Sequence, residues 1–289
     1  MKNNQLLLTF LLIFSTLSLA AQNMRAYQLY TPKGKKVSYK KMLKKLQPAD
    51  IILFGESHNN PIAHWLQLEV AQQLKESNEL IIGAEMFERD NQAALTQYMT
   101  NEIDRKALDS LVRLWNNYTT DYEPLVEFAK ANYIPVIATN IPRKYARIVF
   151  KEGLEALEKL PEEEKKWIAP LPILFDIELP SYKNMLTMMG DDAAHSSLNF
   201  PKAQAIKDAT MAFSILEYFK KGKTFLHLNG SYHSDNYEGI LWYLRQSKPD
   251  LTYKTITTVS QKDIGTLRKE HLGKADFIIC VPENMTKTY

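Results

Sequence analysis

Two segments of the chain share the spacing Gly-x-x-His, and they hold the residues most able to do chemistry. They run from Gly55 to His58 and from Gly230 to His233. A glycine lets the backbone turn sharply as it leaves a strand, because it has no side chain to restrict the turn. An imidazole three residues later can then be directed back over the turn. A pair of such segments is less common by chance than a single one, so we treat both as site candidates.

Two glutamates, Glu56 and Glu85, extend this pair of histidines to a His₂-carboxylate set. Neutral imidazoles and carboxylates suit a divalent metal such as zinc, manganese or iron, so His58, His233, Glu56 and Glu85 are candidate metal ligands. The same four residues suit catalysis without a metal, with a histidine as base and a glutamate as its orienting partner. The alternative is structural: Glu56 and His58 would only cap the next helix, and His233 would only close a turn.

The elements that would position these residues alternate along the chain. Helix-period stretches separate short apolar runs, a pattern typical of βα units. The sequence therefore predicts an α/β fold with a central, mainly parallel sheet flanked by helices. The predicted strands are 50–54, 80–84, 135–138, 224–228, 253–259 and 275–281, and the predicted helices are 62–76, 92–99, 105–114, 123–132, 143–157, 202–220 and 240–246.

Polar residues follow the predicted strands, and in a parallel sheet these strand ends share one edge, where ligands bind. Asn140 and Arg143 follow the third strand, and Asn229 and Gly230 follow the fourth. We expect all four to bind a ligand there, with an amide stabilising an oxyanion and Arg143 pairing a carboxylate or a propionate. An exposed helix arginine without a ligand is the open alternative for Arg143.

Tyr118 lies with Trp115 and Tyr122 in an aromatic cluster that either belongs to the core or lines an apolar pocket. We take Tyr118 as a candidate cofactor-binding residue. Residues from about 160 to 200 have a different composition, and we expect a helical lid inserted over the site. That segment is rich in proline and carries a methionine cluster, Met185, Met188 and Met189.

The remaining histidines receive simpler interpretations. His227 lies inside a predicted strand and is expected to be a hydrogen-bonded core residue. His64, His195 and His271 are expected at the surface, although His195 in the predicted lid could close onto a ligand.

The first twenty residues resemble a secretory signal peptide, with a nearly continuous apolar run at 6–19 and small residues before a cleavage point after Ala20. We therefore expect a single α/β domain over 21–289, exported to the periplasm or secreted, without a transmembrane segment. The balance of 36 basic and 33 acidic residues argues against nucleic acid as a partner. The lone cysteine, Cys280, excludes an internal disulfide, and no cysteine follows the apolar run to carry a lipid.

An ordered set of motifs resembles the ChaN family, the haem-binding uptake branch of the Tiki superfamily, which is related to the TraB and erythromycin esterase proteins. The resemblance extends from about residue 50 to 242. It rests on Leu-Phe-Gly-Glu-Ser-His-Asn at 53–59, Gly-Ala-Glu-Met-Phe at 83–87 with Gln92, Trp115, Tyr118 and Pro124, Ala-Thr-Asn-Ile-Pro-Arg at 138–143 and Asn-Gly-Ser-Tyr-His at 229–233.

The resemblance implies an α/β fold, an exported protein linked to iron or haem uptake, and haem as ligand. The paired motifs of the superfamily fall on Gly55/His58 and Gly230/His233, and its acidic position falls on Glu85. In the Tiki branch such residues are thought to hold a metal for peptide hydrolysis. In the esterase branch they serve hydrolysis without a clear metal.

Two functional hypotheses follow. The first is an exported haem-binding protein for iron uptake, and the alternative is a metal-dependent hydrolase, either a peptidase or an esterase. The expected partner is haem, another small molecule or a peptide. The sequence is also compatible with a homodimer. The spacing does not choose a haem ligand among the side chains able to serve as one, which are Tyr118, Tyr145, Tyr182, Tyr232 and His195.

Overall fold

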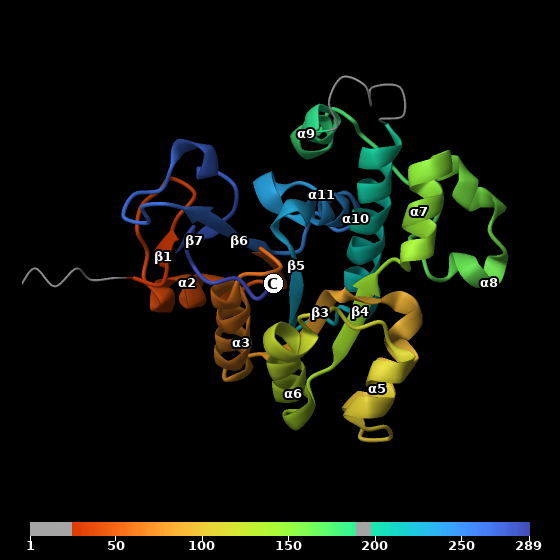
Figure 1. The fold of residues 1–289 in the computed structure, drawn as a ribbon, viewed down its shortest axis with the longest axis horizontal. Helices are drawn as coiled ribbons and strands as arrows, with labels where there is room; N and C mark the ends of the chain where they lie inside the picture. Colours follow the sequence, from red (N-terminus) through yellow and green to blue (C-terminus); the bar gives the residue numbers. More distant parts are fainter. Residues whose placement is uncertain (1–24, 189–197) are drawn as a thin grey trace, which may run out of the picture.

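The computed structural model describes residues 25–188 and 198–289 and has a seven-stranded sheet at its centre (Figure 1). The strands lie in the order β1-β7-β6-β2-β5-β3-β4, and every neighbouring pair is parallel except β1 with β7. The predicted α/β fold with a mainly parallel sheet is confirmed. The strands are β1 Gln28–Tyr30, β2 Ile51–Glu56, β3 Glu79–Glu88, β4 Val136–Asn140, β5 Lys223–Gly230, β6 Tyr253–Gln261 and β7 Phe277–Pro282.

Helices cover both faces of the sheet, and each face has its own apolar cluster. One cluster joins the sheet to α2, α3 and α6, and the other joins it to α10 and α11. The helices are α2 Tyr39–Leu46, α3 Pro61–Lys75, α4 Gln92–Met99, α5 Arg105–Leu111, α6 Glu123–Ala131, α7 Arg143–Glu152, α8 Glu162–Lys165, α9 Pro180–Met188, α10 Asn199–Tyr218 and α11 Ile240–Ser247.

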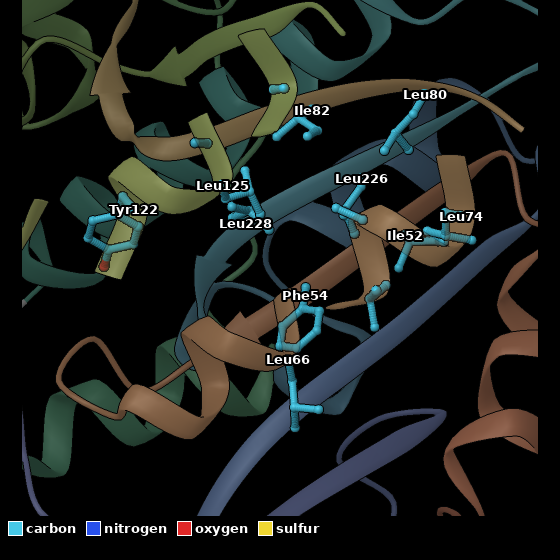
Figure 2. Close-up of a cluster of buried hydrophobic side chains, with 14 of the residues drawn as sticks. Ile52, Phe54, Leu66, Leu74, Leu80, Ile82, Tyr122, Leu125, Leu226 and Leu228 are labelled. Carbon is cyan, nitrogen blue, oxygen red and sulfur yellow. The ribbon is translucent and has the colours of Figure 1, made fainter. Parts of the chain in front are cut away.

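Strand β2 illustrates why the parallel strands are continuously apolar. Ile52 and Phe54 pack into the first cluster, whereas Ile51 and Leu53 pack into the second. Successive side chains of a strand point to opposite faces, so a strand buried on both faces needs an apolar residue at every position. Figure 2 shows Ile52 and Phe54 in the first cluster, close to Leu66 of α3.

Three local differences from the sequence-based expectation have simple causes. Helix α3 begins at Pro61 because the Asn60 side chain caps it, accepting hydrogen bonds from the amides of Ile62 and Ala63 at 3.1 Å each. Helix α7 ends at Glu152 because Gly153 has a φ of 85°, which breaks the helix before a 3₁₀ turn. Strand β1 and helix α2 were not predicted, because both are short and α2 is rich in lysine.

The described part of the predicted lid packs against α10. Ile168 and Ala169 are buried beneath it, and Tyr182 and Met185 of α9 form a small cluster with Ala205 of α10. Residues 189–197 of the predicted lid, among them Met189 and His195, lie outside the described residues, as does the predicted signal peptide at 1–20. Within residues 25–188 and 198–289, no helix is long and apolar enough to cross a membrane.

Candidate functional site

The site lies where β2, β5 and β3 end side by side. Glu56, the last residue of β2, is the register partner of Gly230, the last residue of β5. On the other side of β5, β3 continues through Glu85 beyond its predicted end. These strands are longer than predicted, so the two glutamates belong to strands and not to loops. Their carboxylates are therefore positioned by the sheet itself.

Only one ring nitrogen of His58, Nδ1, has a hydrogen-bond partner among the described residues. Its Nδ1 lies 2.9 Å from Oε1 of Glu56, a carboxylate that is 2 % exposed. The same carboxylate accepts hydrogen bonds from Tyr122 and Gln67, each at 2.6 Å. The His58 side chain is 36 % exposed, and its Nε2 has no hydrogen-bond partner among the described residues. Glu56 therefore fixes the ring orientation and leaves Nε2 as the available nitrogen.

His233 is held at both ends. Its Nδ1 lies 2.5 Å from Oδ1 of Asp208, on α10, and its Nε2 lies 3.3 Å from Oε1 of Glu85. Tyr182 donates a hydrogen bond of 2.8 Å to the other Asp208 oxygen. The imidazole is 6 % exposed. It is thus enclosed by two carboxylates and the protein interior.

The charges at the site raise the pKa of both histidines. Burial disfavours the cationic form of His233, but Glu85 and Asp208 outweigh it and raise the pKa of His233 to about 10. In turn His233 holds the pKa of Glu85 well below its usual range, although burial opposes this. Burial also opposes protonation of His58, yet the bond to Glu56 and the charge of Glu85 raise its pKa. The two carboxylates therefore favour the imidazolium form of His233, although burial also raises the pKa of Asp208.

The two glycines of the paired motifs allow the two segments to approach each other closely. A Cβ added at Gly230 would lie 2.8 and 2.9 Å from Cε1 and Nε2 of His58. A Cβ added at Gly55 would lie 2.9 Å from the Cα of Ser231. Neither glycine has a positive φ, so the predicted sharp turn is not the reason for glycine here. Instead, each motif makes room for the other.

A cavity of about 620 Å³ opens above these groups. Glu56, His58 and His233 lie on its polar side, and Met185, Phe200 and Val259 provide apolar walls. Lys274 also lines the cavity, but Asp235 neutralises it at 3.0 Å. The cavity thus combines the available Nε2 of His58 with an apolar surface.

The other predicted ligand-binding residues are distributed differently. The backbone amide of Gly230 lies at the cavity and donates a hydrogen bond of 2.7 Å to Glu85. Asn229 is fully buried and donates to the Gly230 carbonyl and the Ser234 hydroxyl. Asn140 donates to the backbone carbonyl of Glu85 at 3.0 Å. Both amides hold the backbone around Glu85 and Gly230 and lie outside the cavity lining found in the described residues.

Tyr118 and Arg143 are separated from the paired histidines. Tyr118 is 2 % exposed and packs in the apolar core beneath α6, with the guanidinium of Arg105 4.7 Å from its ring centre. Arg143 begins α7 and lines a second cavity between α7 and α10. Neither residue lines the main cavity in the described part of the chain.

The expected surface position is wrong for His64, whereas His271 is partly exposed. His64 is buried, with Nε2 3.1 Å from the carbonyl of His58, because α3 turns this position toward the site. His271 lines the main cavity, and neither ring nitrogen has a hydrogen-bond partner in the described residues. By contrast, His227 is confirmed as a buried core histidine bonded to Thr139 at 2.8 Å, and burial lowers its pKa to about 4.

Three further residues complete the site and were not predicted from the sequence. Asp208, Gln67 and Gln204 all come from helices, and each contacts a site carboxylate or imidazole. Asp208 has no neighbouring motif that marks it, because its role arises only when α10 packs against the sheet. Within residues 25–188 and 198–289, no group of three or more His, Cys, Asp or Glu side chains is arranged to hold a metal ion.

Comparisons with known proteins agree with this architecture. A family model described as "Haem-binding uptake, Tiki superfamily, ChaN" matches residues 42–244. The solved structure of ChaN from Campylobacter jejuni, described for its cofacial haem binding, superposes with a TM-score of 0.67 at 18 % identity, covering 88 % of this chain and 96 % of that one. An erythromycin esterase in its open conformation gives a TM-score of 0.53 at 10 % identity, covering 90 % and 98 % of the two chains. At these identities the likeness is one of fold.

A curated relative is found in a plant. The protein RETICULATA-RELATED 5, chloroplastic, of Arabidopsis thaliana is 28 % identical over 198 residues. The match covers 63 % of this chain and 26 % of the relative, so the chain spans about a quarter of the relative's length.

Proposed function

This chain belongs to the ChaN haem-binding uptake family of the Tiki superfamily, and from that membership we propose that it binds haem in the main cavity. The observation that carries the proposal is the arrangement of His58. Its Nδ1 is bonded to the buried carboxylate of Glu56, which leaves Nε2 as the nitrogen for a ligand on a ring that lines the cavity. Histidine is a common axial ligand of haem iron, and a carboxylate behind a metal-bound histidine fixes its tautomer.

The rest of the cavity suits a flat apolar ligand. Its volume of about 620 Å³ lies within the range of about 300–1,000 Å³ typical of small-molecule pockets. Met185 and Phe200 come from the segment that precedes and begins α10, and Val259 comes from β6 on the opposite side. These side chains would exclude water from the faces of the ring. When bound, haem would supply the iron centre, and His58 would hold that centre in place.

The hydrolase alternative receives less support from the geometry. A histidine that acts as a base must be neutral, and one that binds a metal must offer a lone pair. His233 meets neither condition at neutral pH, because both ring nitrogens face carboxylates and its pKa is raised to about 10. The paired histidines therefore do not act as two equivalent ligands. We favour haem binding over hydrolysis on this ground.

Titration with hemin tests the proposal directly. We expect the full chain to give a saturable Soret shift, and we expect His58→Ala to alter the position of the Soret band and to weaken binding by about 10- to 100-fold. His271→Ala is the matched control, because it removes a second imidazole from the same cavity. A featureless, nonsaturating response of the wild-type protein would contradict haem binding. Equal spectra for wild type and His58→Ala would remove His58 as the iron ligand.

Export and a role in iron uptake form the wider part of the proposal. They are supported by the apolar run at 6–19 and by the family to which the chain belongs. Cell fractionation and the mass of the N-terminus should find a protein that begins at residue 21, outside the cytoplasm. An uncleaved chain in the cytosol would refute export. Loss of growth on hemin as the iron source after gene deletion would test uptake, and sedimentation with and without hemin would test for a homodimer.

A further inference from the structure

A second cavity lies between α7 and α10, which run side by side next to the sheet (Figure 1). We call it the α7–α10 cleft. It has a volume of about 290 Å³, and Arg143, Arg147 and Lys207 line it without any acidic side chain. The remaining lining residues are Ala146, Phe150, Phe200, Ala203 and Gln204. Three cations therefore surround a small, otherwise apolar and amide-lined space.

The three cations differ from their neighbours on the same helices. Lys144 of α7 forms an ion pair with Glu164 at 3.2 Å, and Lys202 of α10 lies 3.6 Å from Glu155. In contrast, Arg143, Arg147 and Lys207 form no ion pair with any described carboxylate. Arg143 and Arg147 are four residues apart on one helix, a spacing at which like charges repel. An anion in the cleft would relieve that repulsion.

The cleft adjoins the main cavity. Phe200 and Gln204 line both spaces, and the carboxamide of Gln204 lies 2.9 Å from Nδ1 of His233. Phe150 is 48 % exposed at the cleft, with its ring 6.4 Å from that of Phe200 in an edge-to-face arrangement. A ligand in the main cavity would reach these cations where Phe200 and Gln204 separate the two spaces. Such a ligand would need an apolar body and an anionic edge.

We propose that the α7–α10 cleft binds the carboxylate groups of the tetrapyrrole whose ring occupies the main cavity. This inference rests on the proposed haem binding. Guanidinium groups bind carboxylates through paired, charge-assisted hydrogen bonds, and Lys207 adds a third positive charge from the facing helix. The cleft then decides which tetrapyrroles bind, because it selects for free carboxylates. It also sets the direction in which the ring enters.

The test compares hemin with hemin dimethyl ester, in which both carboxylates are masked. The variant is the double substitution Arg147→Gln and Lys207→Gln. We expect it to raise the Kd for hemin about tenfold or more and to leave the Kd for the dimethyl ester unchanged. The matched control is Lys144→Gln with Lys202→Gln, which removes the same charge from the same two helices but at paired positions. The control should bind hemin like the wild type.

The other outcomes are equally decisive. If wild type and the double variant bind hemin equally, the cleft does not bind the carboxylates, whereas haem binding itself stands. If the double variant loses affinity for both compounds by the same factor, the substitutions act on the ring or on the fold, and the inference is overturned. Circular dichroism and the thermal midpoint check the fold of each variant. If the wild type does not bind hemin at all, the proposed function and this inference both fail.

Discussion

The two Gly-x-x-His segments are alike in sequence and opposite in environment. His233 is 6 % exposed and has a carboxylate at each ring nitrogen, whereas the His58 side chain is 36 % exposed and has a carboxylate at one nitrogen only. The difference arises from their neighbours. Helix α10 brings Asp208 against His233, while His58 lies beside the main cavity.

This contrast teaches that a shared motif does not imply a shared role. His233 is a buried cation that holds β3, β5 and α10 together through its two carboxylates. His58 is an oriented imidazole with one nitrogen available for a ligand. The reciprocal packing of Gly55 and Gly230 explains why both motifs share a glycine, since each backbone must pass close to the other segment. The predictions below test this division between a structural and a binding histidine.

The largest expected effect is on stability at His233. His233→Ala would leave Glu85 and Asp208 buried without their shared cation, which typically costs about 3–5 kcal/mol. Urea unfolding measures the loss as a lower midpoint. His58→Ala is the control, and it should cost about 1 kcal/mol or less, because Glu56 keeps its bonds to Tyr122 and Gln67. Equal losses of stability in the two variants would contradict a structural role for His233 and a binding role for His58.

The pH dependence of stability should carry the signature of His233. Its pKa is raised from 6.5 to about 10 in the folded protein, so its contribution is fully present below about pH 6.5 and is lost as pH rises toward 10. The free energy of unfolding should therefore fall between pH 7 and pH 10. His233→Gln should show a shallower fall over the same range. An unchanged slope in that variant would mean that His233 is not the buried cation described here.

A smaller effect is expected for Gly230→Ala. The added Cβ would come within 2.8–2.9 Å of the His58 ring, so the ring or the strand must shift, at a typical cost of about 1–3 kcal/mol. Hemin affinity should fall because Nε2 leaves its position. Gly265→Ala is the control, since its Cβ would meet only the side chain of Asp263. Normal hemin binding by Gly230→Ala would show that the position of His58 does not matter.

The smallest predicted effect is the acid dependence of hemin affinity. Iron needs the neutral form of His58, and the pKa of His58 is raised by its bond to Glu56 and by Glu85, despite burial. Affinity should therefore fall about tenfold per pH unit once the pH is below that raised pKa. Glu56→Gln should move the onset of this fall to lower pH. If Glu56→Gln shows the same pH profile of hemin affinity as the wild type, Glu56 does not control the protonation of His58.

Much of the framework was predictable from local pattern. Strands buried on both faces must be continuously apolar, and parallel strands must end at one edge, so the mainly parallel sheet and the approach of the two motifs followed from the sequence. The strand order did not. The proximity of Glu56 and Glu85 to the paired histidines was also predictable, although the structure places the two glutamates within strands. The reason for the glycines was not predictable, because close approach between two segments cannot be distinguished from a sharp turn within one.

The sequence alone determined the α/β architecture and the set of residues available at the strand ends, since apolar periodicity and residue type are local properties. Only the tertiary structure decided which imidazole lies between two carboxylates and which keeps a ring nitrogen available for a ligand. The reason is that Asp208 reaches His233 from a helix 25 residues earlier in the chain. It also separated Asn140 from Arg143. The side-chain amide of Asn140 donates a hydrogen bond to the backbone carbonyl of Glu85, whereas Arg143 lines the α7–α10 cleft. The charge of a buried group depends on everything packed around it, and packing brings together residues that are distant in sequence.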